Sequence, residues 1–412
     1  MRNDFGEAFH SLGESIDRTW SKENRRKEAF AEIAFESLKD SAILANFDRR
    51  DLIHWVFGSS TLPEQYDLDF GQPPINVYVS RDFYIHVLFW LDATTSIHEH
   101  GFSGAFGVLE GSSVLSAYTF QPVHKLCDAL HLGNLDFTGS EVLRKGDVRI
   151  IHPAERGIHA LFHLDRPSLS VVVRSRKWEG LNTQFSFIKP ALAFDPFYKP
   201  QPMLNQLRML ESLRLSDPAT FWKAAAGVLE SCDPWMLYQT LQIGFRDAYS
   251  EAQNWAKLLE IAGAHLGGEV IDLMKACLAG QQRELGIVSF RSKMHNREHR
   301  FFLALLLNVP DRDIILELIE REFHTEPVAL IEKWIRELVA YQVPTLDLDP
   351  LSVQLLILAT RCPNLAEAVQ FIQRPASDKE EVHELLAEVW GEVKKIDLFR
   401  PLFPAQLAIA GD

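Results

Sequence analysis

The sequence predicts an α+β multidomain protein in which N-terminal helices, an antiparallel β-barrel and a C-terminal all-α domain follow one another. The hydrophobic periodicity is helical over residues 1–70, short and strand-like over 71–188, and helical again over 203–412. We expect the first segment to pack on the barrel. Proline residues punctuate residues 189–202, which we expect to be a linker. A chain of 412 residues has room for two or three domains.

The middle region consists of short apolar or alternating segments with turn residues such as Gly111-Ser112 between them. In the N-terminal segment, by contrast, apolar residues from Ala29 to Leu44 recur near helical spacing. Many short strands at close spacing favour a sandwich or small barrel over a sheet with crossover helices. The predicted strands are Asn76–Val79, Tyr84–Leu91, Ser96–His100, Ala105–Glu110, Ser113–Phe120, Glu141–Arg144, Val148–Ile151, Gly157–Leu164 and Ser168–Ser175.

The C-terminal region contains helix starts in which a capping residue precedes a proline. Two ordinary amphipathic helices are predicted at Ile314–Glu322 and Val328–Val339, and Ser377–Glu380 has the pattern of a capping box. No fixed repeat period is present, so we expect one all-helical domain rather than a solenoid. The predicted starts are Asp217-Pro218, Asp233-Pro234, Thr325-Glu326-Pro327 and Asp349-Pro350.

The composition of the chain disfavours several classes of function. The net charge of −14 disfavours binding to nucleic acid or to anionic lipid. The four cysteines are widely separated and form no C-x-x-C pair, which is typical of a reducing compartment. The longest apolar run, Phe301–Leu307, is too short to span a membrane, and the N-terminus lacks a signal-peptide pattern. We therefore expect a cytoplasmic protein.

The segment Ser96–Gly101 carries the main chemical signal. Side chains alternate along a strand, so His98 and His100 project from one face about 7 Å apart along the backbone. Both can then reach one metal ion at about 2.1 Å. His159 opens a later strand after a Gly-Asp turn, and we expect it to supply the third ligand. Three neutral imidazoles leave coordination positions open, which catalysis by a metal requires.

This order of features resembles the two motifs of the cupin superfamily. The first motif normally supplies a Glu four or five residues beyond the second His, where this chain has Gly104 and Ala105. Cupins with three His and without this Glu resemble the thiol dioxygenases, the cysteine dioxygenase family. The resemblance covers about residues 75–178 and includes Val87–Leu91, Ser96–His100 and the closing strand Pro167–Ser175.

The resemblance implies a jelly roll in which His98, His100 and His159 hold Fe(II). Nickel, manganese and zinc also accept imidazole ligands. Some family members carry a Cys, crosslinked to a Tyr, where this chain has Ala105. The family's Ser-x-His-x-Tyr set falls on a strand in which only the Ser is kept, as Ser170. Its carboxylate-binding Arg has no clear match, because Arg81 lies in a predicted turn. A substrate other than cysteine is therefore favoured.

Three polar residues are candidates for catalytic roles beside the metal: Ser170, Arg174 and His163. His163 shares strand parity with His159 and is either an acid–base partner or a packed histidine. Arg174 pairs with an anionic substrate if it faces inward, and is a solvated strand residue if it faces outward. His152 is an alternative metal ligand if the third strand is shifted, and otherwise a turn residue.

A competing metal motif occurs at His295–His299, which spells H-x-x-E-H. Its surroundings are basic, which disfavours a zinc site. The function we expect is a mononuclear non-heme iron cupin oxygenase, resembling the thiol dioxygenases, that acts on a small molecule, such as a thiol, with O2. The alternative is a metal- or ligand-binding cupin module with a helical interaction domain and no catalysis.

Overall fold

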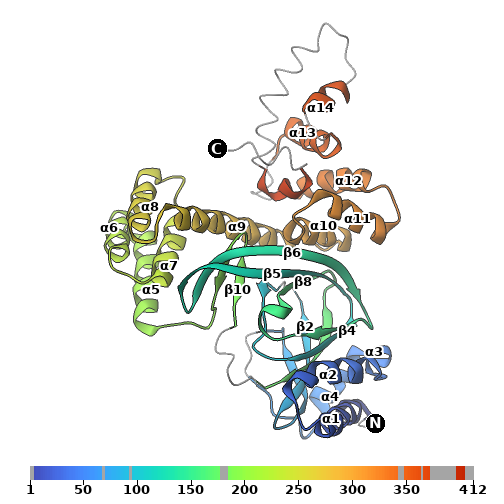
Figure 1. Cartoon of the computed structure of the whole chain (residues 1–412). Helices are drawn as coiled ribbons and strands as arrows, with labels where there is room; N and C mark the ends of the chain where they lie inside the picture. The colour runs from blue at the N-terminus through green and yellow to red at the C-terminus, as the bar shows by residue number, and fades with distance from the viewer. Residues whose placement is uncertain are drawn as a thin grey trace. The chain divides into compact units, whose positions relative to one another are not determined.

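Figure 1 shows the computed structural model of the chain, which describes residues 4–66, 70–91, 95–176, 184–341, 348–362, 365–371 and 396–403. The chain divides into two compact units. One contains residues 1–138 and 142–282, and the other contains residues 139–141 and 283–412. The helices before residue 283 therefore group with the strands, whereas the sequence analysis placed every residue after 202 in one domain.

The strands are antiparallel and form two sheets. They are β1 (Pro74–Val79), β2 (Phe83–Trp90), β3 (Ile97–His98), β4 (Gly104–Glu110), β5 (Ser112–Cys127), β6 (Leu130–Arg144), β7 (Val148–Ile151), β8 (His159–His163), β9 (Ser168–Ser175), β10 (Ser186–Ile188) and β11 (Leu192–Phe194). One sheet has the order β1-β2-β9-β4-β7, and the other has the order β10-β11-β6-β5-β8-β3. The second sheet closes, because β3 pairs with both β8 and β10. The predicted α+β class, with antiparallel strands between helical regions, is confirmed.

Every predicted strand corresponds to an observed one, but two strands are longer and two were not predicted. Strand β5 continues to Cys127 and β6 begins at Leu130. These extensions carry exposed side chains such as Val123, which breaks the apolar alternation on which the prediction relied. Strand β11 lies within the predicted linker 189–202 and pairs with β6, so this part of the segment belongs to a sheet.

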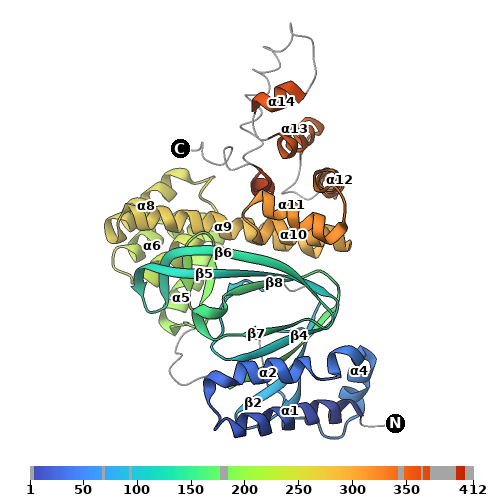
Figure 2. The ribbon, with the colours of Figure 1, turned by 45° about the vertical axis from the view of Figure 1, so that its right-hand side comes forward.

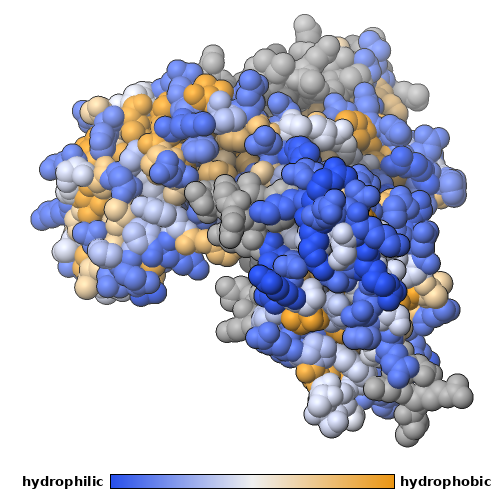
Figure 3. All heavy atoms as spheres, turned by 60° about the horizontal axis from the view of Figure 1, so that its bottom comes forward, coloured by the Kyte–Doolittle hydropathy of each residue, from blue (hydrophilic) through white to orange (hydrophobic). Residues whose placement is uncertain are grey.

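Helices from the N-terminal segment cover one face of the first sheet (Figure 2). They are α1 (Asp4–Lys22), α2 (Phe30–Lys39), α3 (Ile43–Asn46) and α4 (Arg49–Gly58). Phe9, Phe30 and Leu38 share a buried cluster with Val171 and Val173 of β9. Hydrophilic residues cover most of the surface on the outer side of these helices (Figure 3). Each helix therefore buries one apolar face against the sheet, and the alternate residues of the strands point the other way.

Those alternate residues face the second sheet and form a separate core. Phe106 of β4 and Val172 of β9 belong to one buried cluster with Leu143 of β6 and Leu161 of β8. The two sheets therefore pack face to face. Any small-molecule site between them is lined by the inward residues of β2, β4, β8 and β9.

Five further helices complete the first unit or begin in it. They are α5 (Gln201–Ser216), α6 (Pro218–Leu229), α7 (Pro234–Phe245), α8 (Ala252–Leu266) and α9 (Gly268–Ser292), and the boundary between the units falls within α9. Trp222 and Tyr238 pack in one cluster with Leu130 and Leu192 of the second sheet. The predicted caps are confirmed, since the Asp233 carboxylate accepts a hydrogen bond from the Met236 N–H over 2.9 Å.

Apart from residues 139–141 of β6, the second unit is helical in its described part. Its helices are α10 (Arg297–Asn308), α11 (Arg312–Phe323), α12 (Pro327–Val339), α13 (Pro350–Arg361) and α14 (Leu365–Phe371), followed by a 3-10 turn at Asp397–Leu402. Asp349 caps α13 as predicted, and α12 begins at the predicted place but is capped by Glu326 rather than by Thr325. The predicted capping box at Ser377–Glu380 lies outside the described residues. Within the described ranges, no helix combines the length and the apolar character needed to cross a membrane.

Candidate metal centre

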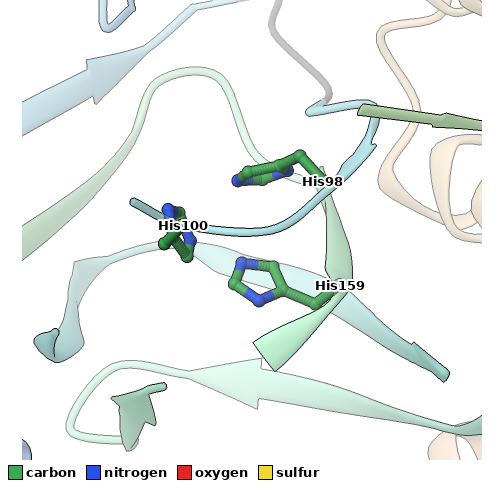
Figure 4. A group of neighbouring side chains, drawn as sticks. All are labelled: His98, His100 and His159. Carbon is green, nitrogen blue, oxygen red and sulfur yellow. The ribbon is translucent and has the colours of Figure 1, made fainter. Parts of the chain in front are cut away.

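The three predicted histidine ligands lie together. His98 ends β3 and His159 begins β8, and their Cα atoms are direct partners across the antiparallel pair. His100 follows two residues after His98. Its carbonyl oxygen accepts a hydrogen bond from the Ala154 N–H over 2.9 Å, which anchors the segment beyond the strand. Figure 4 shows the three imidazole rings gathered around a common space, and one nitrogen from each lies within 4.8 Å of the others.

The chain folds tightly where β8 begins. A Cβ atom on Gly157 would lie 2.3 Å from the carbonyl oxygen of His152, so only glycine permits this close approach. The turn holds the Gly157 carbonyl oxygen 3.1 Å from Nδ1 of His159. The residue type at position 157 therefore helps to orient the third ring.

Backbone carbonyls select the tautomer of two of the rings. Nδ1 of His98 lies 2.8 Å from the carbonyl oxygen of Ser96, and Nδ1 of His159 has the equivalent contact with Gly157. A carbonyl oxygen can only accept, so each Nδ1 carries the proton and donates it. The lone pair of each imidazole is then on Nε2. This is the arrangement that metal-binding histidines normally use.

Burial keeps the three imidazoles neutral. It lowers the pKa of His159 to about 3 and also lowers the pKa of His98. The pKa of His100 is lowered further, by burial first and then by the neighbouring imidazoles and Arg174. Nε2 of His100 is buried without a hydrogen-bond partner in the described part of the chain. Neutral rings with available lone pairs are the protonation state that a metal ion requires.

The site has no carboxylate ligand among the described residues. Glu99 lies between two of the histidines, but its Oε1 accepts a hydrogen bond from the Phe185 N–H over 3.1 Å. Burial raises the pKa of this carboxyl group to about 7. Aromatic rings line the site instead: Phe102 lies 4.6 Å from His100 and Phe106 lies 6.2 Å from His159, between ring centroids. The donor set is therefore three imidazoles in an apolar surrounding.

The donor set fits a divalent transition metal. An ion about 2.1 Å from each nitrogen holds two ligands no more than about 4.2 Å apart. The observed limit of 4.8 Å means that the rings need to approach one another only slightly. Each of the three residues keeps partial solvent exposure, so a ligand can reach the space between them. The buried lone pair on His100 would also gain a partner when a metal binds.

Arg174 faces inward, close to this group. It pairs with Tyr84 of β2 on one side and with Gly104 of β4 on the other. Its guanidinium carbon lies 3.7 Å from the centroid of Phe102, the same ring that contacts His100. The position also explains Gly104, because a Cβ there would lie 1.9 Å from the Val173 carbonyl oxygen. Of the two orientations left open by the sequence, Arg174 therefore has the inward one.

Ser170 and His163 lie elsewhere between the sheets. Ser170 accepts a hydrogen bond from Nε1 of Trp90 over 2.9 Å. His163 stacks on Trp90 with ring centroids 4.6 Å apart, and its Nδ1 lies 2.8 Å from the Ser113 hydroxyl oxygen. His163 is four residues from His159 along β8, about 13 Å at the rise of a strand. The two residues form a packed polar cluster and are not brought into the three-histidine group.

The remaining sequence candidates do not join the site. Ala105 faces away from it, in the cluster beneath the N-terminal helices. His152 is outside the histidine group, and the Arg81 carbonyl oxygen accepts a hydrogen bond from Arg176. In the H-x-x-E-H segment, Nε2 of His299 is 2.7 Å from a Glu337 oxygen. Among the described residues, the only cluster with metal-binding geometry is the one at His98, His100 and His159.

Sequence reasoning missed His86, which is fully buried on β2. Its ring lies 5.3 Å from Tyr84 and 5.7 Å from Phe70, between centroids. Burial, and then Arg174, lower the pKa of His86 well below its usual value. The run Phe83–Trp90 is apolar apart from His86, so its sequence does not show which residues face inward. The only available signal was that His86 is two residues from Tyr84 and therefore shares its face.

Comparison with known proteins does not identify the chain. No protein-family model matches the sequence, and no curated protein matches it. The assignment of a function therefore rests on the site itself.

Proposed function

We propose that this protein is a mononuclear non-heme iron oxygenase of the cupin type, similar to the thiol dioxygenases, that acts on a small molecule with O2. One observation carries the proposal. Three neutral imidazoles converge, and they come from two paired strands and the adjoining segment. In two of them Nδ1–H donates a hydrogen bond to a backbone carbonyl. Two facing antiparallel sheets, one of them closed, are compatible with a cupin jelly roll.

In this proposal His98, His100 and His159 hold the metal. Fe(II), when bound, supplies redox chemistry with O2 and open positions for a substrate. Nickel, manganese or zinc would fit the same nitrogen donors. The absence of a carboxylate ligand from the described site leaves more positions open than a closed structural metal site has.

The other residues of the site bind substrate and exclude water. Phe102 and Phe106 remove water from the neighbourhood of the imidazoles. Arg174 gives the pocket one positive charge, which favours an anionic substrate. A thiol that carries an acid group is therefore the first class of substrate to test. Apolar walls also strengthen each electrostatic contact made inside the pocket.

The experiment is oxygen consumption by the iron-loaded protein. The full chain is loaded with Fe(II) without air, desalted, and mixed with a panel of thiols and other small acids at an O2 electrode. We expect at least one compound to give consumption that the metal-free protein and the His159→Ala variant do not give. Tightly bound metal with no consumption across the panel would favour the binding module, and a chain that retains no metal would contradict the oxygenase.

A further inference from the structure

Beside the three histidines lies the half-buried guanidinium of Arg174, which has no acidic partner among the described residues. Nε of Arg174 is buried and has no hydrogen-bond partner, and no carboxylate in the described part of the chain lies within 4.0 Å of its guanidinium nitrogens. Its contacts are with three rings, at 3.7 Å from Phe102, 5.2 Å from Tyr84 and 5.7 Å from Phe70. A buried charge is costly unless it is paired. A ligand with one negative charge would supply the missing partner.

A second polar group beside Arg174 also lacks a partner. His86 is opposite Val172, and Tyr84 is opposite Arg174, so His86 and Arg174 are diagonal neighbours on one face of the β2–β9 pair. Both ring nitrogens of His86 are buried and have no hydrogen-bond partner among the described residues. A neutral imidazole offers one N–H donor. The guanidinium and this donor can therefore bind the same acceptor group.

The walls around the two groups indicate what the rest of the ligand is like. The rings of Phe70, Tyr84 and Phe102 surround the guanidinium, and no acidic side chain joins them in the described structure. Phe70 is about one-third exposed, so this ring lies at the surface. Flat apolar ligands pack well against such rings. One guanidinium and one neutral imidazole also match a monoanion better than a doubly charged phosphate.

The subsite is within reach of the histidine group. Phe102 touches both, with the guanidinium on one side and His100 at a centroid distance of 4.6 Å. The guanidinium carbon and the His100 ring are therefore separated by no more than the sum of the two distances to Phe102. One small organic molecule can bridge this span.

We propose that Arg174 and His86 form a binding site for the carboxylate of a small organic acid with a flat, apolar body, walled by Phe70, Tyr84 and Phe102. The inference rests on the proposed function only in that the other end of the acid lies at the metal. The binding site itself requires no metal. It adds to the acid-bearing substrate of the proposed function a flat apolar body, aryl or unsaturated, and it makes His86 a specificity-determining residue.

The test measures binding to the metal-free full chain by isothermal titration calorimetry, with phenylacetate, phenylacetamide and propionate as probes. We expect phenylacetate to bind at least about tenfold more tightly than either of the others, because the amide lacks the charge and propionate lacks the ring. Equal affinity for phenylacetate and phenylacetamide would overturn the role of the charge. Equal affinity for propionate would overturn the apolar body.

Variants then assign the residues. Arg174→Met should weaken phenylacetate binding by about tenfold or more, and His86→Phe should weaken it by a smaller factor. Arg176→Met is the matched control, since this exposed arginine of the same segment bonds to the carbonyls of Arg81 and Ser80. Wild-type affinity in Arg174→Met, or an equal loss in Arg176→Met, would contradict the proposal.

Two further measurements separate this inference from the proposed function. The thermal midpoint of Arg174→Met should equal or exceed that of the wild type, because an unpaired buried charge is removed. A large fall in the midpoint would show that the guanidinium is already paired, which would overturn the inference. The iron content of Arg174→Met should equal that of the wild type. Loss of acid binding with iron retained leaves the metal site intact, whereas wild-type protein that binds phenylacetate but no iron would overturn only the proposed function.

Discussion

The position of the proton on each imidazole ring decides which nitrogen has a lone pair that could bind a metal ion. The carbonyl oxygens of Ser96 and Gly157 fix that proton on Nδ1 of His98 and His159, and the lone pair of each ring is then on Nε2. His163, on the same strand, has its Nδ1 next to a serine hydroxyl and its ring against Trp90. The neighbours of each ring therefore leave His159 available to a metal ion and hold His163 in a packed position.

This difference predicts the outcome of two substitutions. His159→Ala removes a ligand and should lower metal affinity by about a hundredfold or more, because even the loss of a supporting hydrogen bond costs ten- to a hundredfold. His163→Ala should lower the free energy of unfolding by about 1–3 kcal/mol and leave the metal content near that of the wild type. Metal analysis after desalting measures both. Equal metal retention in the two variants would place the third ligand elsewhere.

The buried imidazoles also predict a pH dependence for the metal-free protein. Burial lowers the pKa of His86, His98, His100 and His159 in the native state, to about 3 for His159. In the unfolded chain the pKa of histidine is about 6.5. Between these values the unfolded chain binds protons that the native chain does not, so the free energy of unfolding decreases as the pH falls below about 6.5. Each such histidine contributes up to about 1.4 kcal/mol per pH unit.

Urea unfolding of chelator-treated protein at pH 7, 6 and 5 measures this slope. The control is His86→Phe, which removes one buried imidazole outside the metal ligands and should make the slope shallower. A free energy of unfolding that is the same at pH 5 and pH 7 would contradict the neutral state of these rings.

The sequence allowed the group of three histidines to be predicted, but not the residues around them. His98 and His100 are two apart on a strand, which places them on one face whatever the rest of the fold is. His86 could not be assigned in this way, because its strand is buried on both faces and shows no alternation. Ser170 and His163 lie outside the three-histidine group, because strand parity gives the face of a residue and not its distance along the strand.

At the scale of elements, the pairing of strands β4 and β9, which positions Arg174, depends on a glycine. Gly104 opposes Arg174, and a Cβ at this position would lie 1.9 Å from the Val173 carbonyl oxygen. Because the obstacle is backbone, it cannot move aside as a flexible side chain can. The beginning of β4 therefore approaches β9 closely at the position of Arg174.

Gly104→Ala should consequently destabilise the first unit by about 3 kcal/mol or more, since overpacking of this kind forces the backbone to shift. Chemical unfolding followed by circular dichroism measures the change. Gly139→Ala is the control, because a Cβ at Gly139 of β6 meets no described atom within 4 Å. Equal stability of the two variants would contradict the close approach of β4 to β9.

Element boundaries could be predicted where local chemistry marks them. The Asp-Pro and Glu-Pro pairs set the starts of α6, α7, α12 and α13, because a capping carboxylate and a proline act within one turn. The extensions of β5 and β6 and the short strands β10 and β11 could not be predicted in this way. They are fixed by pairing with distant strands, and their sequences carry too few alternating residues to show it.

At the scale of the whole molecule, every residue of the proposed site belongs to the first compact unit. The three ligands come from strand positions about 60 residues apart in sequence, so a bound metal stabilises the native state and has no equivalent site in the unfolded chain. The domain boundary could not be predicted at residue 282, because it falls inside the continuous helix α9 and no linker composition marks it.

Metal binding should therefore raise the thermal stability of the full chain. At a free metal concentration one hundred times the dissociation constant, the expected stabilisation is about 2.7 kcal/mol. Differential scanning calorimetry with and without the metal measures it, and the combined His98→Ala, His100→Ala and His159→Ala variant is the control. A shift of the same size in that variant would mean that the metal binds somewhere else.

The most direct test of three imidazoles sharing one ion is the X-ray absorption spectrum of the metal in the loaded full chain. We expect nitrogen and oxygen neighbours at about 2.0–2.2 Å, together with the outer-shell scattering of about three imidazole rings. A first shell dominated by sulfur or carboxylate oxygen, or a spectrum without imidazole scattering, would contradict it.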